Sequence, residues 1–120
     1  MSAFLTAFLL ASALGSAGDV SGEYRVKNEI AGNVSEMTCT FTQKETSING
    51  TCVTEQGSTS EVAGNTQDDK IDWVFKTLYE GNTITLTYKG NIADGQIRGT
   101  VTVEEFSVTG DFLATPVAKK

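Results

Sequence analysis

The chain of 120 residues contains no histidine, and this absence removes several kinds of active site. Hydrolases whose catalytic triad depends on an imidazole base are excluded, and so are the common histidine-rich metal sites. The two cysteines, Cys39 and Cys52, fall short of the four nitrogen or sulfur ligands of a tetrahedral zinc centre. The sequence therefore predicts no metal site and no cofactor.

Basic residues are also scarce. The chain has 9 Lys and Arg against 15 Asp and Glu, which gives a formal net charge of -6, and its longest basic run is Lys119-Lys120. Nucleic-acid binding needs clustered basic side chains to neutralise phosphates, and anionic membranes attract the same clusters. We therefore expect neither a nucleic-acid partner nor adsorption to an anionic membrane surface.

Helical periodicity is missing from Gly22 onward, where apolar and polar residues alternate with period two. Short connections with turn-forming residues separate the alternating runs: Gly32-Asn33, Glu45-Thr46, Glu55-Gln56-Gly57, Asp68-Asp69, Glu80-Gly81, Asp94-Gly95 and Glu104-Glu105. The only proline, Pro116, follows the last run. Eight sequential strands in one open sheet would expose two edges, and a sandwich would need longer crossovers. The sequence thus predicts an all-β, eight-stranded antiparallel up-and-down barrel over residues 18–115, with a tail at 116–120.

The turn positions also fix a register. The predicted cross-strand pairs are Cys39 with Cys52, Phe41 with Gly50, Trp73 with Tyr88, Phe75 with Leu86, Tyr88 with Val101, and Val101 with Val108. The same register places Ile71, Gly90, Gly99 and Gly110 in one row across four strands. Inward glycines in neighbouring strands let a sheet coil sharply, or else let another group approach its backbone.

The first 17 residues have a different character. An apolar run, Phe4 to Leu10, is followed by small residues that end in Gly15-Ser16-Ala17, which predicts a signal peptide cleaved after Ala17 or Ala13. The alternative is an apolar helix that stays attached, and the run is too short to span a membrane. A signal peptide indicates a secreted or periplasmic protein, and in an oxidising compartment Cys39 and Cys52 are expected to form a disulfide.

Several stretches carry a family resemblance: Ser21-Gly22-Glu23-Tyr24, Gly50-Thr51, Gly99-Thr100, and the run from Thr83 to Val103. They resemble the small calycin-like barrels of exported bacterial proteins of unknown role. More distantly they resemble avidin and lipocalin barrels, although Tyr24 replaces the tryptophan that opens their first strand. The resemblance implies a closed end at the start of the first strand and an open mouth at the first hairpin loop.

With that polarity, the inward residues divide into two groups. The apolar group expected at the closed end comprises Tyr24, Phe41, Ile48, Ile71, Ile92, Ile97 and Phe112. Hydrogen-bonding residues are expected near the mouth, namely Asn28, Thr54, Ser60, Thr77 and Tyr79, with aromatic walls from Trp73 and Tyr88. The division predicts an exported, non-catalytic protein that binds a small, partly apolar or amphipathic ligand at its open end.

Three other interpretations remain open. The mouth residues are either a ligand site or simply a solvated rim, and the interior is either hollow or filled as in a purely structural domain. Alternatively, the protein is an interaction module such as a protease inhibitor, with residues 18–21 as a flexible plug. An enzyme is not expected, because the carboxylates of Asp68-Asp69, Asp94 and Glu104-Glu105 fall in solvated turns.

Overall fold

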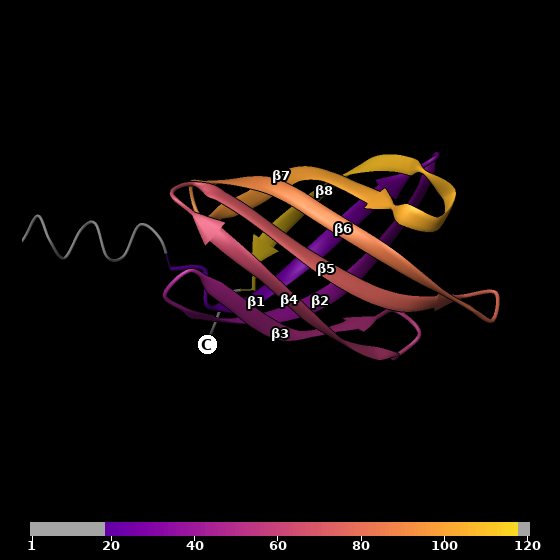
Figure 1. The fold of residues 1–120 in the computed structure, drawn as a ribbon, viewed down its shortest axis with the longest axis horizontal. Helices are drawn as coiled ribbons and strands as arrows, with labels where there is room; N and C mark the ends of the chain where they lie inside the picture. Colours follow the sequence, from indigo (N-terminus) through magenta and orange to yellow (C-terminus); the bar gives the residue numbers. More distant parts are fainter. Residues whose placement is uncertain (1–18, 118–120) are drawn as a thin grey trace, which may run out of the picture.

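The computed structural model describes residues 19–117, which form a closed barrel of eight antiparallel strands in sequential order (Figure 1). The elements are β1 (Gly22–Ile30), β2 (Asn33–Lys44), β3 (Ser47–Thr54), β4 (Thr59–Gln67), β5 (Lys70–Tyr79), β6 (Asn82–Ala93), β7 (Gln96–Val103), the 3₁₀-helix η1 (Glu104–Phe106) and β8 (Val108–Pro116). Pairing of β1 with β8 closes the barrel, which confirms the predicted fold class. The predicted signal peptide and the last three residues of the predicted tail lie outside the described residues.

Alternation along each strand sorts the side chains between the core and solvent. On β5, Ile71, Trp73 and Phe75 are buried, whereas the intervening Asp72 and Val74 are exposed. Successive side chains of a strand point to opposite faces of the sheet, so a period of two buries one face of every strand. The interior of the barrel is the single hydrophobic core of the described residues.

Most of the predicted register is confirmed. Cys39 lies opposite Cys52 and Phe41 opposite Gly50 in the β2–β3 hairpin. Trp73 pairs with Tyr88 between β5 and β6, as predicted. The predicted pairs Phe75 with Leu86 and Tyr88 with Val101 are also present.

Two connections near the start of the chain differ from the prediction. The first turn is Ala31-Gly32 rather than Gly32-Asn33, with φ angles of 53° and 83°. A two-residue hairpin of this kind needs positive φ at both central positions, so Asn33 becomes the first residue of β2. The β3–β4 connection contains four residues and not the predicted three, since β4 begins at Thr59 and not at Ser58.

The connection before β8 was predicted wrongly. Glu104–Phe106 forms η1, and Ser107 adopts a left-handed conformation with φ of 54°, so the connection is longer than the predicted two residues. β8 is therefore displaced by two residues: Val103 pairs with Val108, and Val101 pairs with Gly110. The row of inward residues that begins Ile71, Gly90 and Gly99 consequently ends at Phe112 and not at Gly110. Pro116 is the last residue of β8 instead of following it.

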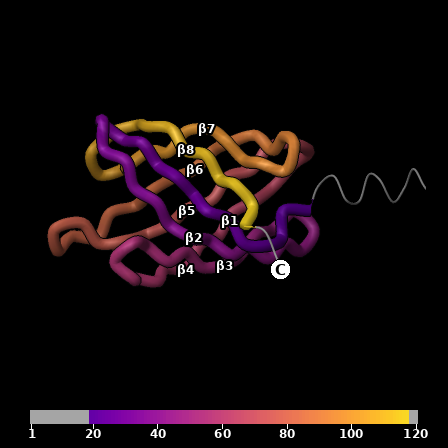
Figure 2. The backbone as a smooth tube through the Cα atoms, turned by 180° about the vertical axis from the view of Figure 1, so that it is seen from behind, coloured from indigo at the N-terminus to yellow at the C-terminus, as the bar shows by residue number. Residues whose placement is uncertain are grey.

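The two ends of the barrel are closed to different extents. At one end the segment that precedes β1 lies across the barrel, with Val20 only 1% exposed (Figures 1 and 2). The backbone N–H of Val20 donates to Oε1 of Gln43 at 2.8 Å, and the Gln43 N–H donates to Oγ of Ser21 at 3.0 Å. At the other end lie the β1–β2, β3–β4 and β5–β6 connections and η1, and the β5–β6 hairpin projects beyond its neighbours (Figure 1). We call the end covered by the segment before β1 the closed end, and the end with these connections and η1 the mouth.

Candidate functional site

The mouth half of the barrel encloses a cavity of about 720 Å³. Small-molecule sites typically occupy about 300–1,000 Å³, so the volume suits a ligand of metabolite size. Its lining residues come from β1, β2, β3, β5, β6, β7, β8, the three mouth connections β1–β2, β3–β4 and β5–β6, and η1. The cavity is therefore part of the barrel interior, reached through the mouth.

Apolar side chains form the wall. Those in the core cluster that also line the cavity are Met37, Phe75, Ile84, Leu86 and Val103, each no more than 8% exposed. All five are inward residues of the period-two pattern. Apolar contact area is the main source of affinity for a small ligand in such a site.

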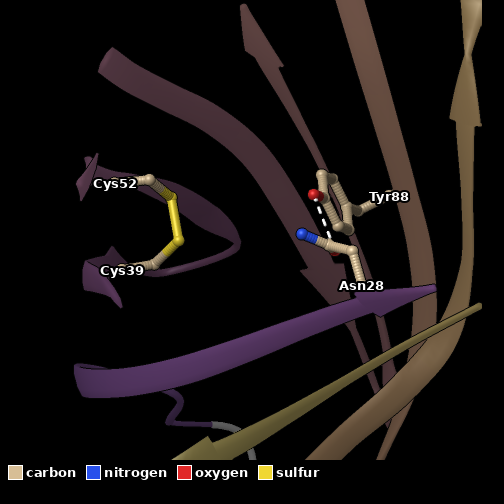
Figure 3. Close-up of a disulfide and its surroundings, with 4 residues drawn as sticks. All are labelled: Asn28, Cys39, Cys52 and Tyr88. Carbon is tan, nitrogen blue, oxygen red and sulfur yellow. Dashed lines mark hydrogen bonds between the residues drawn. A yellow bond between two sulfur atoms is a disulfide. The ribbon is translucent and has the colours of Figure 1, made fainter. Parts of the chain in front are cut away.

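A buried polar pair forms the floor. Tyr88 is fully buried and its hydroxyl donates to Oδ1 of Asn28 at 2.9 Å, while Asn28 is 4% exposed (Figure 3). Burial raises the pKa of the Tyr88 phenol well above its ordinary value, and the hydrogen bond with Asn28 lowers it only in part. The floor is therefore neutral at physiological pH.

The amide nitrogen of Asn28 has spare hydrogen-bonding capacity. It donates to no residue within 19–117, and Figure 3 shows it on the side of Asn28 that faces the disulfide. Asn28 lines the cavity. A primary amide carries two N–H donors, so the floor offers a donor for which the described residues supply no acceptor.

Replacing Tyr88 with phenylalanine is expected to lower the free energy of unfolding by about 1–2 kcal/mol, because the buried Asn28 carbonyl loses its donor. Urea denaturation measures the loss. Tyr24→Phe makes the same chemical change at the closed end, where no described residue bonds the Tyr24 hydroxyl, and it should cost less. Equal losses in the two variants would contradict a stabilising Tyr88–Asn28 bond.

Aromatic side chains fill the barrel below the floor. Trp73 stacks on Tyr88 with ring centroids 4.7 Å apart and planes at 12°. Phe41 and Phe112 contact Trp73 at centroid distances of 4.9 and 5.3 Å. Trp73 is fully buried, and its Nε1 has no hydrogen-bond partner among the described residues. The closed half is thus occupied by side chains, and the hollow is confined to the mouth half.

Two half-exposed aromatic rings mark the rim. Tyr79 and Phe106 are 51% and 54% exposed, and their rings meet edge to face at 6.1 Å. The carboxylate of Glu105 holds η1 against β6, since it accepts hydrogen bonds from the N–H and the hydroxyl of Thr85 at 2.7 and 3.0 Å. The backbone hydrogen bond from Thr85 lowers the pKa of Glu105. Phe106 is therefore positioned over the mouth by an anchored turn.

The sheet is split beside the mouth. The β4–β5 pairing runs only as far as Val62 and Phe75, whereas β5 continues to Tyr79 paired with β6 alone. Lining residues lie on both sides of the split, with Ser58 before β4 and Thr77 on β5. The opening is consequently wider on this side, where the β5–β6 hairpin diverges from β4 (Figure 1).

Only acidic side chains contribute charge to the cavity. Glu36, Glu55 and Glu80 line it, and no lysine or arginine does so. Within the described part of the chain, no three His, Cys, Asp or Glu side chains lie close enough together to hold a metal ion. The three carboxylates are therefore separate charges around the rim.

The structure brings together five of the seven residues predicted to bind a ligand. Asn28, Thr54, Thr77, Tyr79 and Tyr88 all line the cavity. The other two lie elsewhere: Ser60 is half-buried opposite Cys52, and Trp73 lies beneath Tyr88. The apolar wall and Phe106 were missed, although Phe75, Ile84 and Leu86 lie at inward positions of the period-two pattern on β5 and β6.

Cys39 and Cys52 form the predicted disulfide, and both are fully buried. A buried disulfide is compatible with an oxidising extracellular or periplasmic location. The described part of the segment considered as an inhibitory plug, Asp19 to Ser21, is docked on the barrel with Val20 in the core. It therefore contributes to closing the barrel.

No protein-family description matches the chain, and no curated protein matches it significantly. Within residues 19–117, no helix has the length and apolar character needed to cross a membrane.

Proposed function

We propose that this protein is an exported, non-catalytic binding protein that holds a small, partly apolar ligand in the mouth cavity. The observation that carries the proposal is a hollow of about 720 Å³ with an apolar wall and a buried Tyr88–Asn28 pair at its floor. A structural barrel of this size can fill its interior with side chains, as the closed half of this one does. The unfilled mouth half instead matches an apolar site with a few placed polar groups.

Export is the second part of the proposal. It is supported by the apolar segment and small residues predicted as a signal peptide, by the buried disulfide, and by the resemblance to calycin-like barrels of exported bacterial proteins. A carrier in an oxidising compartment gains from a covalent cross-link between two strands of its barrel.

A neutral apolar fluorophore tests the binding proposal. Phenylnaphthylamine should become brighter and bind saturably to the oxidised, folded protein at micromolar concentration, because the cavity removes its rings from water. The probe's own emission is the readout, since Trp73 lies below the cavity floor and senses the ligand only through Tyr88. Absence of saturable binding by phenylnaphthylamine and by decanol would overturn the proposal.

A matched pair of variants locates the site on β6. Ile84→Trp places a large side chain inside the hollow, where Ile84 is 8% exposed, and should weaken probe binding more than about ten-fold, equivalent to 1.4 kcal/mol. Thr87→Trp adds the same side chain to the outer face of the same strand and should leave binding within about two-fold of the unmodified protein. Equal effects of the two variants would place the probe elsewhere.

A further inference from the structure

The charge of the mouth bears on which ligand enters it. Glu36 on β2, Glu55 in the β3–β4 connection and Glu80 in the β5–β6 turn all line the cavity, and no basic side chain does so. The whole chain is also acidic, with a formal net charge of -6. Like charges repel, so the rim opposes the approach of an anion and favours a cation.

The interior holds no positive charge to pair with an anion. The floor consists of a neutral phenol and a neutral amide, and the wall is apolar. A carboxylate or sulfate carried into the cavity would be a buried charge without a counter-ion, which is unfavourable. Neither end of the cavity therefore suits the head group of a fatty acid.

The rim supplies a second feature that suits a cation. Tyr79 and Phe106 form an edge-to-face pair with centroids 6.1 Å apart, and each is about half exposed. The face of an aromatic ring attracts an ammonium group within about 6 Å of its centre. Both rings line the cavity together with Glu80, which follows Tyr79 in the chain.

The floor supplies a separate indication that the cavity takes a ligand at all. The Asn28 residue is only 4% exposed, and its amide nitrogen donates to no described residue. Because Asn28 lines the cavity, this donor can be satisfied by a ligand or by water inside the cavity. It would donate to a carbonyl or hydroxyl oxygen at the inner end of the ligand.

We propose that the mouth cavity selects amphiphiles whose exposed end is a cationic amine. This inference rests on the proposed function, and it assigns the apolar part of the ligand to the wall. The ammonium group lies at the rim, between the three carboxylates and the Tyr79–Phe106 pair.

The test compares three probes that share one decyl chain: decanol, decyltrimethylammonium and decanoate, each below its micelle concentration. Their affinities are measured by calorimetry and by displacement of phenylnaphthylamine. Decyltrimethylammonium should bind about ten-fold more tightly than decanoate in low salt, with decanol between them. The advantage should shrink as salt is raised, because salt screens exposed charges.

Two triple variants with the same change in net charge separate a local effect from a general one. The first variant removes the rim charges through Glu36→Gln, Glu55→Gln and Glu80→Gln. It should reduce the preference for the cation over decanoate to about two-fold or less. Glu23→Gln, Glu45→Gln and Asp94→Asn remove three exposed charges toward the closed end and should leave most of the preference intact.

The outcomes distinguish the two proposals. If none of the three probes binds, the proposed function itself fails. If decanol binds but decanoate binds as well as the cation, or if the two triple variants act alike, ligand binding stands and charge selection is overturned. Phe106→Leu should weaken the binding of decyltrimethylammonium several-fold more than the binding of decanol. Equal losses of affinity would show that the aromatic pair does not contact the ammonium group.

Discussion

Replacing Gly64 with alanine is expected to lower the free energy of unfolding by more than about 3 kcal/mol, beyond the usual cost of overpacking a core. Gly64 lies on β4 opposite Trp73 on β5. A Cβ atom at this position would collide with the carbonyl oxygen of Asp72, and it would lie 2.6 Å from Cα and 2.7 Å from Cβ of Trp73. Backbone atoms cannot yield without moving a strand, so the variant should either unfold at low denaturant or disturb the aromatic cluster.

Gly90→Ala is the matched control on β6. There the nearest atoms to an added Cβ are the Arg98 carbonyl oxygen at 2.7 Å and Cζ of the Phe112 ring at 3.0 Å. The approach to the backbone oxygen is less severe than at Gly64, so a smaller backbone shift relieves it, and the ring can also move. The expected loss is therefore smaller, about 1–2 kcal/mol. Chemical denaturation followed by circular dichroism measures both variants, and a Gly64→Ala protein as stable as the unmodified one would contradict the close strand packing at Trp73.

Removal of the disulfide is the second large expected effect. The Cys39→Ala, Cys52→Ala double variant should lose about 3 kcal/mol, because the chain-entropy account gives this value for a loop near 15 residues and the cysteines are separated by 13. Both side chains are fully buried, so the smaller alanines also leave unfilled space in the core. Denaturant unfolding with and without reductant measures the contribution.

The neighbouring pair Thr40 and Thr51 provides the control for the disulfide. These residues face each other across the same two strands, one position from the cysteines, and both are exposed. Replacing both with alanine should cost less than about 1 kcal/mol, the range of an exposed cross-strand pair. A double cysteine variant no less stable than this control would show that the bridge does not stabilise the barrel.

The strands and four of the two-residue turns were predictable because their signals are local, and Glu45-Thr46 and Asp68-Asp69 form as predicted. Glu80-Gly81 and Asp94-Gly95 combine a first residue that tolerates positive φ with a glycine, and both turns form there. The connection before β8 was not predictable in this way. Phe106 continues the alternation of an inward strand residue, yet it lies in a 3₁₀ turn held by the long-range contact between Glu105 and Thr85.

The candidate site was predictable in part for the same reason. Period two identified which polar and aromatic side chains face inward. Five of the seven residues predicted from it to bind a ligand line the cavity. The depth of the cavity depends instead on how the large rings share space across strands. Trp73 stacks on Tyr88 of the neighbouring strand, and Gly64 leaves room for it on the other side. These contacts join different strands, so the pattern of any one strand does not predict them.

The proposed binding function requires a barrel that is filled at one end and able to accept a ligand at the other. Methyl groups report on both ends: Ile84, Leu86 and Val103 line the cavity, whereas Ile48, Ile71 and Ile97 are buried in the core without lining it. Titration of the oxidised protein with decanol, followed by methyl chemical shifts in nuclear magnetic resonance spectra, tests this arrangement most directly. Binding in the mouth cavity should give saturable shifts of the methyl groups of Ile84, Leu86 and Val103. The methyl groups of Ile48, Ile71 and Ile97 should change little. Absence of shifts, or shifts centred on the second group or on the outer face of the barrel, would contradict it.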